Sequence, residues 1–568
     1  TFSPSTNIAT KGYLTSGDGG SGSWVQNGLT VQTPSQSPAQ LGSALLNDAN
    51  GNQWELRSSG ATKAKSLGAA FDGVTDDTLA IQACLAFPQL SVELPDGDTV
   101  INDSGLTMTS DQAIFGQGKA RTRILITPIS TTTLFDVSLA SGGYNSLNIR
   151  GLSVVTKGAG VGQSILRTPK NSEGLTNKHS FYVDDLYSLG TAPWVSSFDV
   201  GDHVNGSLSN IDLRGSYNAA LPDAGQAQTT GISLDCAQGG FGFQIFNFKM
   251  SGFRTPIFIG VGVEAFYVRD GESTTSWYGI RSTQPNSSPG GNVQNVHISA
   301  NKYPIHIANR RNFQIDNVQL YRNTGVADDH TGDWAGLVLS NCSRVNLSAI
   351  QVRHPDEYKS SSARVGVQIA TNSFNISLNG LSCGYGNGLT SALVVINSQG
   401  VTACGIVCEQ TSSSIVQLIG GGAETFIGPI AYNSSLISSV PISISAGSSV
   451  SSVKVSRDST YIPKFNSREL VSSTPDVYMY AGVDASHTEL IDVEVTTAYT
   501  QRTTLQNDNA LYGDEFSFRV VINAAQKATL EIRNEDLSIQ RAFTATGDYW
   551  VTWIFNGTQW TVKAQGDN

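Results

Sequence analysis

Carboxylates are the side chains of this chain whose chemistry is easiest to define. The sequence has 46 Asp and Glu residues. It contains no GxSxG nucleophile motif, no HExxH zinc motif and no glycine-rich phosphate loop, and its 7 His residues are scattered. A pair of carboxyl groups therefore remains as the catalytic device. Two such groups, one protonated and one ionised, are what hydrolysis of a glycosidic bond requires.

A pair of carboxylates needs a scaffold, and the middle of the chain contains a repeating one. An eight-residue unit, apolar-x-apolar-x-x-apolar-x-apolar, predicts two short strands joined by a two-residue corner. Its clearest copies begin at residues 147, 181, 243, 313, 345, 376, 401 and 425, and weaker copies begin at 206, 266 and 291. A third short strand precedes most copies, as in GISL (231–234) and PIFI (256–259).

Three short strands per repeat, without room for a helix, predict an all-β fold, a parallel β-helix. Alternation places the apolar members of each strand inside, and outward residues of adjacent coils then lie about 4.8 Å apart. Corner residues such as Asp316-Asn317 and Asn379-Gly380 suit the left-handed backbone that a corner needs. Cys383 and Cys408 hold the same inward position in adjacent coils, so we expect stacked thiols rather than a disulfide or metal pair.

Composition limits the partners of this chain. Only 14% of residues are charged and the net charge is −11, which disfavours nucleic acid and anionic membranes. No apolar run approaches the roughly 18 residues that would span a bilayer. The sequence TFSPSTNIATKGY has neither the basic nor the apolar part of a secretion signal and lacks Met, so we expect residue 1 to be a cut boundary.

The segments that flank the repeats predict separate parts. In residues 66–86, Asp76 is placed to cap a short amphipathic helix that closes the open end of the solenoid. After about residue 470, longer alternating strands and an Asn-Gly hairpin turn predict a small β-sandwich or jelly roll. We therefore expect a head segment at 1–65, the capping helix and catalytic β-helix at 66–465, and the sandwich at 466–568.

Residues 66–86, with VELPDGDTVI (92–101) and AIFGQGKARTRILI (113–126), resemble the start of pectate-lyase-like β-helices, above all bacteriophage tailspikes and capsular depolymerases. GDGGSGSW (17–24) and DANGNQWEL (48–56) resemble the head region of such tailspikes. The resemblance implies a right-handed, single-stranded β-helix, a homotrimer, and a C-terminal domain for trimerisation or carbohydrate binding. It also implies a virion protein, joined to the phage tail by an N-terminal region, that acts outside the cell on a capsular or lipopolysaccharide glycan.

In the resembled family the sugar lies along the strand that precedes the eight-residue unit. Register then selects Asp235, one residue after GISL, and Glu264, in the turn after PIFI. Apolar neighbours in IGVGVEAFY are expected to raise the pKa of Glu264 and make it the acid, with Asp235 as the ionised partner. A rival catalytic set consists of Asp270, Glu272 and Asp316, with Glu272 expected between Lys249 and His297.

Aromatic and polar residues near this face suit sugar binding, because rings stack on a pyranose and guanidinium groups pair with acidic sugars. The candidates are Trp277, Tyr278, Arg281, Tyr303, His306, Arg310 and Trp334. Asp328, Asp329, His330 and Asp333 are expected to form a solvated loop rather than a metal site. The polygalacturonase signatures NTD, GDD, GHG and RIK are absent, and no tight acidic cluster suits a calcium-dependent lyase, so we expect no metal and no cofactor.

Three functions remain open at this point. The favoured one is an endo-glycosidase that cuts a bacterial surface polysaccharide with paired carboxylates. The second is a polysaccharide lyase that eliminates across a uronic acid with a Tyr, His or Lys base. The third is a glycan-binding adhesin without catalysis.

Overall fold

The structure of this chain is a computed structural model. It describes residues 7–9, 23–30, 45–47, 52–57, 62–86, 91–109, 111–137, 145–168, 170, 179–190, 193–221, 223, 225–237, 240–323, 333–355, 363–384, 388–409, 411–421, 425–428, 430–432, 442–444, 453–455, 467–472, 476–480, 489–495, 500–506, 515–522, 529–534, 539–543, 547–555 and 560–567. The chain divides into two compact units, residues 1–218 with 223–276, and residues 219–222 with 277–568.

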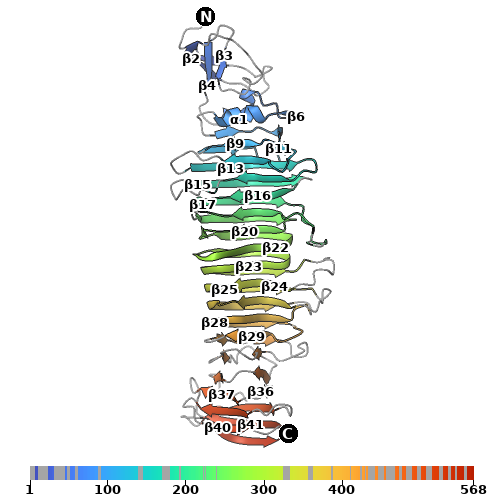
Figure 1. Ribbon diagram of the computed structural model, residues 1–568, viewed down its shortest axis with the longest axis vertical. Helices are drawn as coiled ribbons and strands as arrows, with labels where there is room; N and C mark the ends of the chain where they lie inside the picture. Colours follow the sequence, from blue (N-terminus) through green and yellow to red (C-terminus); the bar gives the residue numbers. More distant parts are fainter. Residues whose placement is uncertain are drawn as a thin grey trace. The chain divides into compact units, whose positions relative to one another are not determined.

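The first unit consists almost entirely of strands, stacked one above another as Figure 1 shows. It begins with a four-stranded antiparallel sheet, in the order β1-β2-β4-β3, inside the predicted head segment. Its elements are β1 (Asn7–Ala9), β2 (Ser23–Thr30), β3 (Leu45–Asn47), β4 (Asn52–Arg57), β5 (Thr62–Lys63), a 3-10 helix (Ala64–Leu67), β6 (Asp72–Asp76), α1 (Thr78–Ala86), β7 (Ser91–Glu93), β8 (Gly97–Ile101), β9 (Leu106–Met108), β10 (Gln112–Phe115), β11 (Thr122–Ile126), β12 (Thr133–Val137), β13 (Asn145–Thr156), β14 (Gly162–Arg167), β15 (His179–Gly190), β16 (Trp194–Val200), β17 (His203–Arg214), β18 (Thr230–Leu234), β19 (Gly240–Ser251), β20 (Thr255–Ile259), β21 (Val263–Glu264) and β22 (Tyr267–Pro289), which runs on into the second unit.

The second unit is also built from strands. Its elements after β22 are β23 (Asn292–Tyr321), β24 (Trp334–Ser340), β25 (Ser343–Arg353), β26 (Arg364–Ala370), β27 (Phe374–Cys383), β28 (Ser391–Cys408), β29 (Val416–Gly421), β30 (Thr425–Ile427), β31 (Ile430–Tyr432), β32 (Ile442–Ile444), β33 (Val453–Val455), β34 (Ser467–Ser472), β35 (Asp476–Tyr480), β36 (Glu489–Val495), β37 (Thr500–Gln506), β38 (Glu515–Ile522), β39 (Thr529–Asn534), β40 (Ile539–Phe543), β41 (Gly547–Phe555) and β42 (Trp560–Asp567).

Each coil pairs in parallel with the coil before and the coil after it, and the pairing keeps the repeat units in register. In the first unit the strands β13, β15, β17, β19 and β22 align the second apolar position of five repeat copies. The aligned residues are Ile149, Val183, Leu208, Ile245 and Val268, and all of them are buried. Burying each such side chain contributes roughly 1.5–3 kcal/mol, so the repeat supplies the core of the solenoid directly. The all-β, parallel solenoid predicted from the sequence is confirmed.

The same stacking holds in the second unit. Strands β23, β25, β27 and β28 align Ile315, Leu347, Leu378 and Ala403, which are buried. Cys383 and Cys408 are direct register partners, and both thiols are buried and form no disulfide. The predicted thiol ladder is therefore confirmed.

The helix at the N-terminal end of the solenoid is as predicted. Residues Ile81, Cys84 and Leu85 on one face of α1 are buried. The carboxylate of Asp76 accepts a hydrogen bond from the backbone N–H of Thr78, the first helical residue, at 2.9 Å. Figure 1 shows α1 beside the first strands of the stack, where it covers the end of the core. In the described part of the chain, no helix is long and apolar enough to cross a membrane.

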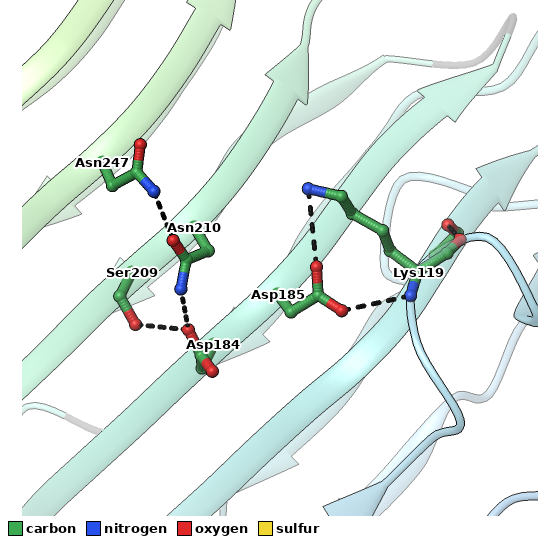
Figure 2. Close-up of polar contacts among 7 residues, drawn as sticks. Lys119, Asp184, Asp185, Ser209, Asn210 and Asn247 are labelled. Atoms are coloured by element: carbon green, nitrogen blue, oxygen red, sulfur yellow. Dashed lines mark hydrogen bonds and ion pairs between the residues drawn. The ribbon is translucent and has the colours of Figure 1, made fainter.

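Polar side chains stack at the corners of the first unit, as Figure 2 shows. Asn247 donates a hydrogen bond to the side-chain oxygen of Asn210, and Asn210 donates one to Asp184 Oδ1 at 2.6 Å. Ser209 Oγ donates to the same Asp184 oxygen at 2.7 Å. Asn210 and Asn247 have φ angles of 54° and 50°, in the left-handed region that Asn tolerates. These hydrogen bonds thus give partners to the Asn side chains that the left-handed backbone of the corners favours.

The predicted corners of the second unit follow the same rule. Asn317 has φ 49° and Gly380 has φ 80°, as expected for Asp316-Asn317 and Asn379-Gly380. Asn317 Nδ2 donates a hydrogen bond to Asn295 Oδ1 at 2.8 Å.

Strand pairing in residues 466–568 differs from what a separate antiparallel sandwich would show. Parallel pairing continues across residue 466, because β32 pairs with β34 and β33 pairs with β35. It persists through β36 to β38 and through β37 to β39. Antiparallel pairs appear only later in the described strands, where β38 pairs with β41, β39 with β40 and β41 with β42. The Asn-Gly turn at 556–557 lies outside the described residues.

The corner at Asn317 gives a test of this architecture. Asn317→Val places a β-branched residue at φ 49° and removes the hydrogen bond to Asn295, so we expect the free energy of unfolding to fall by about 1–3 kcal/mol. Asn317→Gly keeps the backbone conformation, and we expect it to lose less. Urea midpoints of the two variants and the wild type measure the difference. Equal midpoints for Val and Gly would contradict the backbone requirement.

Candidate active site

An outward column of four polar residues and one phenylalanine crosses five parallel strands of the first unit. Strands β12, β14, β16, β18 and β20 pair in sequence, and their inward residues, such as Phe198, are fully buried. Alternation then turns the next residue of each strand outward. The outward column, in register, is Asp136, Arg167, Asp199, Ser233 and Phe258. Each of these five residues keeps some exposure to solvent.

Asp235 lies just beyond β18, next to this column, and its carboxylate is held on both oxygens. Its backbone N–H donates to Val200 O at 2.9 Å, directly after Asp199 in the chain. Oδ1 accepts the backbone N–H of Val261 at 2.9 Å, and Oδ2 accepts Lys170 Nζ at 2.5 Å. A Cβ at Gly260 would lie 2.8 Å from Asp235 Cβ and Oδ1. Glycine at residue 260 therefore leaves the room that this carboxylate occupies.

Asp199 is in a different environment from Asp235. Burial raises the pKa of the Asp199 carboxyl, and the negative charge of Asp235 adds to that increase. The charges of Lys170 and Arg167 oppose the increase but do not cancel it. Asp199 thus holds a proton to higher pH than an ordinary Asp.

The two cations beside the carboxylates have separate partners. Partial burial opposes the charge of Lys170, but its hydrogen bond to Asp235 and the charges of Asp235 and Asp199 together raise its pKa. Arg167 is bound to Asp136 through two hydrogen bonds, Nε to Oδ1 at 2.9 Å and Nη2 to Oδ2 at 2.7 Å. Lys170 therefore anchors Asp235, while Arg167 is directed toward Asp136.

This arrangement separates two carboxyl groups by environment. The pKa of Asp199 is raised, and Asp235 accepts hydrogen bonds from an ammonium and an amide. Carboxyls whose environments differ in this way divide acid and base roles between them. The column and Asp235 together can therefore serve general acid–base chemistry on a ligand lying against the outer face of β16 and β18.

Of the two catalytic residues favoured from the sequence, only Asp235 belongs to this cluster. Glu264 is exposed, so the apolar surroundings expected to favour its acid form are not found. Its register partner is Phe241 in β19, whereas Val261 is the residue that contacts the Asp235 carboxylate. In IGVGVEAFY, Val263 and Phe266 are buried in the core, whereas Val261 and Tyr267 are exposed, as Glu264 is.

The rival catalytic set is not brought together by the described contacts. Asp270 is an exposed corner residue with φ 55°. Glu272 faces Lys249 as its register partner, with Nζ and Oε2 3.8 Å apart, as expected on that side. Asp316 accepts hydrogen bonds from Gln294 Nε2 at 3.2 Å and from Ser348 Oγ. These contacts give Asp270 and Asp316 places in the corners of the solenoid.

Five of the seven predicted sugar-binding residues do lie together, in the second unit. Ring centroids are 6.5 Å apart for Trp277 and Tyr278, 6.0 Å for Tyr278 and Tyr303, and 5.3 Å for Tyr303 and His306. The guanidinium of Arg281 lies 4.5 Å from the centre of the Tyr278 ring.

The other two predicted sugar-binding residues are buried, and that prediction is wrong for them. Arg310 is fully buried and donates from Nε to Ser282 Oγ at 3.0 Å. Trp334 is 1% exposed, and its indole N–H donates to Ala300 O at 3.2 Å. The sequence alone did not distinguish these two buried side chains from exposed ones.

Residues Asp328, Asp329 and His330 of the long loop lie outside the described residues. Asp333 is described, and its Oδ1 accepts the backbone N–H of Ala363 at 3.1 Å. Among the residues that the structure describes, no group of three or more His, Cys, Asp or Glu side chains could hold a metal ion.

Asp199 is the residue that sequence reasoning missed. The stretch WVSSFDV (194–200) has the alternation of a strand that precedes a repeat copy, with Asp199 between two buried residues. An outward carboxylate on such a strand, one coil before Asp235, was the signal that could have identified it.

Comparisons with known proteins show no family for this chain. No family model matches this sequence, and no curated protein matches it. The enzymatically active domain of tailspike protein 2 from bacteriophage CBA120 is 14% identical, with TM-score 0.36, over 75% of this chain and 55% of that chain. This chain thus spans about half the length of that tailspike domain.

Two carbohydrate enzymes are similar in the same way. The A-module of the Azotobacter vinelandii mannuronan C-5 epimerase AlgE6 is 13% identical, with TM-score 0.40, over 70% of this chain and 100% of that chain. The catalytic unit of a GH87 alpha-1,3-glucanase from Streptomyces thermodiastaticus is 12% identical, with TM-score 0.40, over 72% of this chain and 71% of that chain. At these values the similarity concerns the fold alone.

The raised pKa of Asp199 predicts a pH-dependent stability. A carboxyl whose pKa is higher in the folded than in the unfolded state stabilises the fold below its unfolded pKa, and that contribution is lost as pH rises through its folded pKa. Asp199→Asn has no titrating carboxyl at this position, so the variant does not lose this stability as pH rises. We expect the melting temperature of the variant, relative to wild type, to increase between about pH 4 and about pH 7. A difference that stays constant over this range would contradict the assignment.

Proposed function

We propose that this chain cleaves a polysaccharide by hydrolysis, with Asp199 as the general acid and Asp235 as the ionised partner. The single observation that supports this proposal is the pair itself: two carboxyls on one outer face, one with a raised pKa and the other anchored by Lys170. Glycoside hydrolysis needs one protonated and one ionised carboxyl group at the same time.

In this mechanism Asp199 donates its proton to the glycosidic oxygen as the bond from that oxygen to the anomeric carbon breaks. Asp235 either removes a proton from the attacking water or attacks the anomeric carbon itself. Val261 N–H and Lys170 orient the Asp235 carboxylate in both cases. Ser233 separates Asp199 from Phe258 in the column, so the aromatic ring is placed to stack on a neighbouring sugar.

We further propose that the protein is a phage tailspike depolymerase acting on a bacterial capsular or lipopolysaccharide glycan. The resemblance of residues 66–126 to the start of tailspike β-helices supports this setting. The proposal includes a right-handed β-helix, in line with the general preference of parallel crossover connections, and a homotrimer in the virion. It also includes attachment to the phage tail on the N-terminal side and a supporting role for residues 466–568.

The carboxylate pair can be tested by isosteric substitution. Asp199→Asn and Asp235→Asn are each expected to lower kcat by about 10²- to 10⁴-fold, because each removes one acid–base group. Binding of the polysaccharide is expected to persist. New reducing ends released from polysaccharide of a susceptible host strain measure the rate, and Glu264→Gln serves as the exposed-carboxylate control.

The same assay separates the alternative functions. Near-normal turnover in both Asp variants would exclude the proposed pair. An unsaturated, ultraviolet-absorbing product would identify a lyase that eliminates across a uronic acid. Binding without any new reducing ends in the wild type would identify an adhesin.

Phe258 gives a separate test of where the glycan lies. We expect Phe258→Ala to raise KM about two- to tenfold with a smaller change in kcat, because a stacked ring contributes about 0.5–1.5 kcal/mol. Phe258→Tyr keeps the ring and is expected to restore wild-type KM. An unchanged KM in the Ala variant would place the glycan elsewhere.

A further inference from the structure

An aromatic and cationic cluster in the second unit lies outside the proposed catalytic pair. It is formed by β22 and β23, which are neighbours in the sheet. The cluster, named here the Tyr303 cluster, consists of Tyr278, Arg281, Lys302, Tyr303 and His306. Arg281 lies 4.5 Å above the Tyr278 ring and Lys302 Nζ lies 5.3 Å from the Tyr303 ring centre. Aromatic rings and positive charge therefore meet in one place.

Two buried nitrogens of the cluster have no hydrogen-bond partner among the described residues. They are Nε of Arg281 and Nδ1 of His306. Buried polar atoms in folded proteins are almost always hydrogen-bonded. The guanidinium N–H lies near the Tyr278 ring and the imidazole nitrogen near the Tyr303 ring, and both groups match the hydroxyl and carboxylate oxygens of a sugar acid.

The charges of the cluster favour an anionic ligand. Burial, together with the positive charges of Arg281 and Lys302, lowers the pKa of His306 to about 4, so the imidazole is neutral at pH 7. Burial raises the pKa of Tyr303, and Tyr278 and Asp333 add to the increase, so the phenol keeps its proton. Arg281 and Lys302 thus bring two positive charges to the cluster in a chain whose net charge is −11, and Asp333 is an anion near Tyr303.

We propose that the Tyr303 cluster is a saccharide-binding site for a carboxylated sugar residue, separate from the catalytic pair. The sugar carboxylate pairs with Arg281 and Lys302, and its ring stacks on Tyr303. Arg281 Nε and His306 Nδ1 take the remaining hydrogen bonds to the ligand. The inference rests on the proposed function only in taking the ligand to be a glycan, and it names an acidic glycan as the substrate class.

The test compares acidic oligosaccharides with their uncharged counterparts. The full chain carrying Asp199→Asn is titrated calorimetrically with hexamers of galacturonate, mannuronate and sialic acid, and with the same hexamers after reduction of their carboxyl groups. We expect at least one acidic hexamer to bind at least about tenfold more tightly than its reduced form. Arg281→Gln is expected to remove that preference, and Lys302→Gln to weaken it.

Arg353→Gln is the matched control, because Arg353 also lies over a tyrosine ring, 5.6 Å from the centre of Tyr321. It is expected to bind as the parent does. Binding that is insensitive both to carboxyl reduction and to Arg281→Gln, or that is absent for all acidic hexamers, would overturn the proposal. Loss of cleavage in Asp199→Asn is measured independently, so failure of the catalytic proposal and failure of this one give different results.

Discussion

Parallel stacking of coils in exact sequence register is the constraint on which both units depend. Inward apolar residues find buried apolar partners one coil away, as Ile149, Val183 and Leu208 do. A shift of one residue would turn those side chains outward and place polar ones inside. The core therefore fixes where each outward residue lies, and the column containing Asp199 follows from the burial of Phe198.

This constraint explains how a chain of few charges can create a specialised site. Outward residues of adjacent coils lie about 4.8 Å apart, a distance at which charges and hydrogen bonds interact strongly. Asp136, Arg167 and Asp199 become neighbours although more than thirty residues of sequence separate each from the next. Strand register thus brings these distant side chains together, whereas in other folds a short sequence motif places the residues of a site side by side.

Strand register also determines which parts of the molecule were predictable from sequence. Periodicity identified the coils, the corner residues near Asn317 and the thiol stack of Cys383 and Cys408, because each depends only on local pattern and repeat length. The catalytic candidate Glu264 was less predictable, since exposure depends on how β21 meets β19. Arg310 and Trp334 were misplaced because long polar and aromatic side chains can be buried when they find hydrogen-bond partners.

Electrostatic environment, rather than residue type, separates the carboxyls of the first unit. Asp136 and Asp235 each lie against a cation, whereas Asp199 is partly buried and shares its cations with other acids. The proton affinity of Asp199 therefore depends on the ion pair between Lys170 and Asp235. A glycan that displaced water from this face would strengthen all of these interactions, because the surrounding dielectric falls. Binding of the ligand would then increase the difference in environment between the two carboxyls, on which the proposed hydrolysis depends.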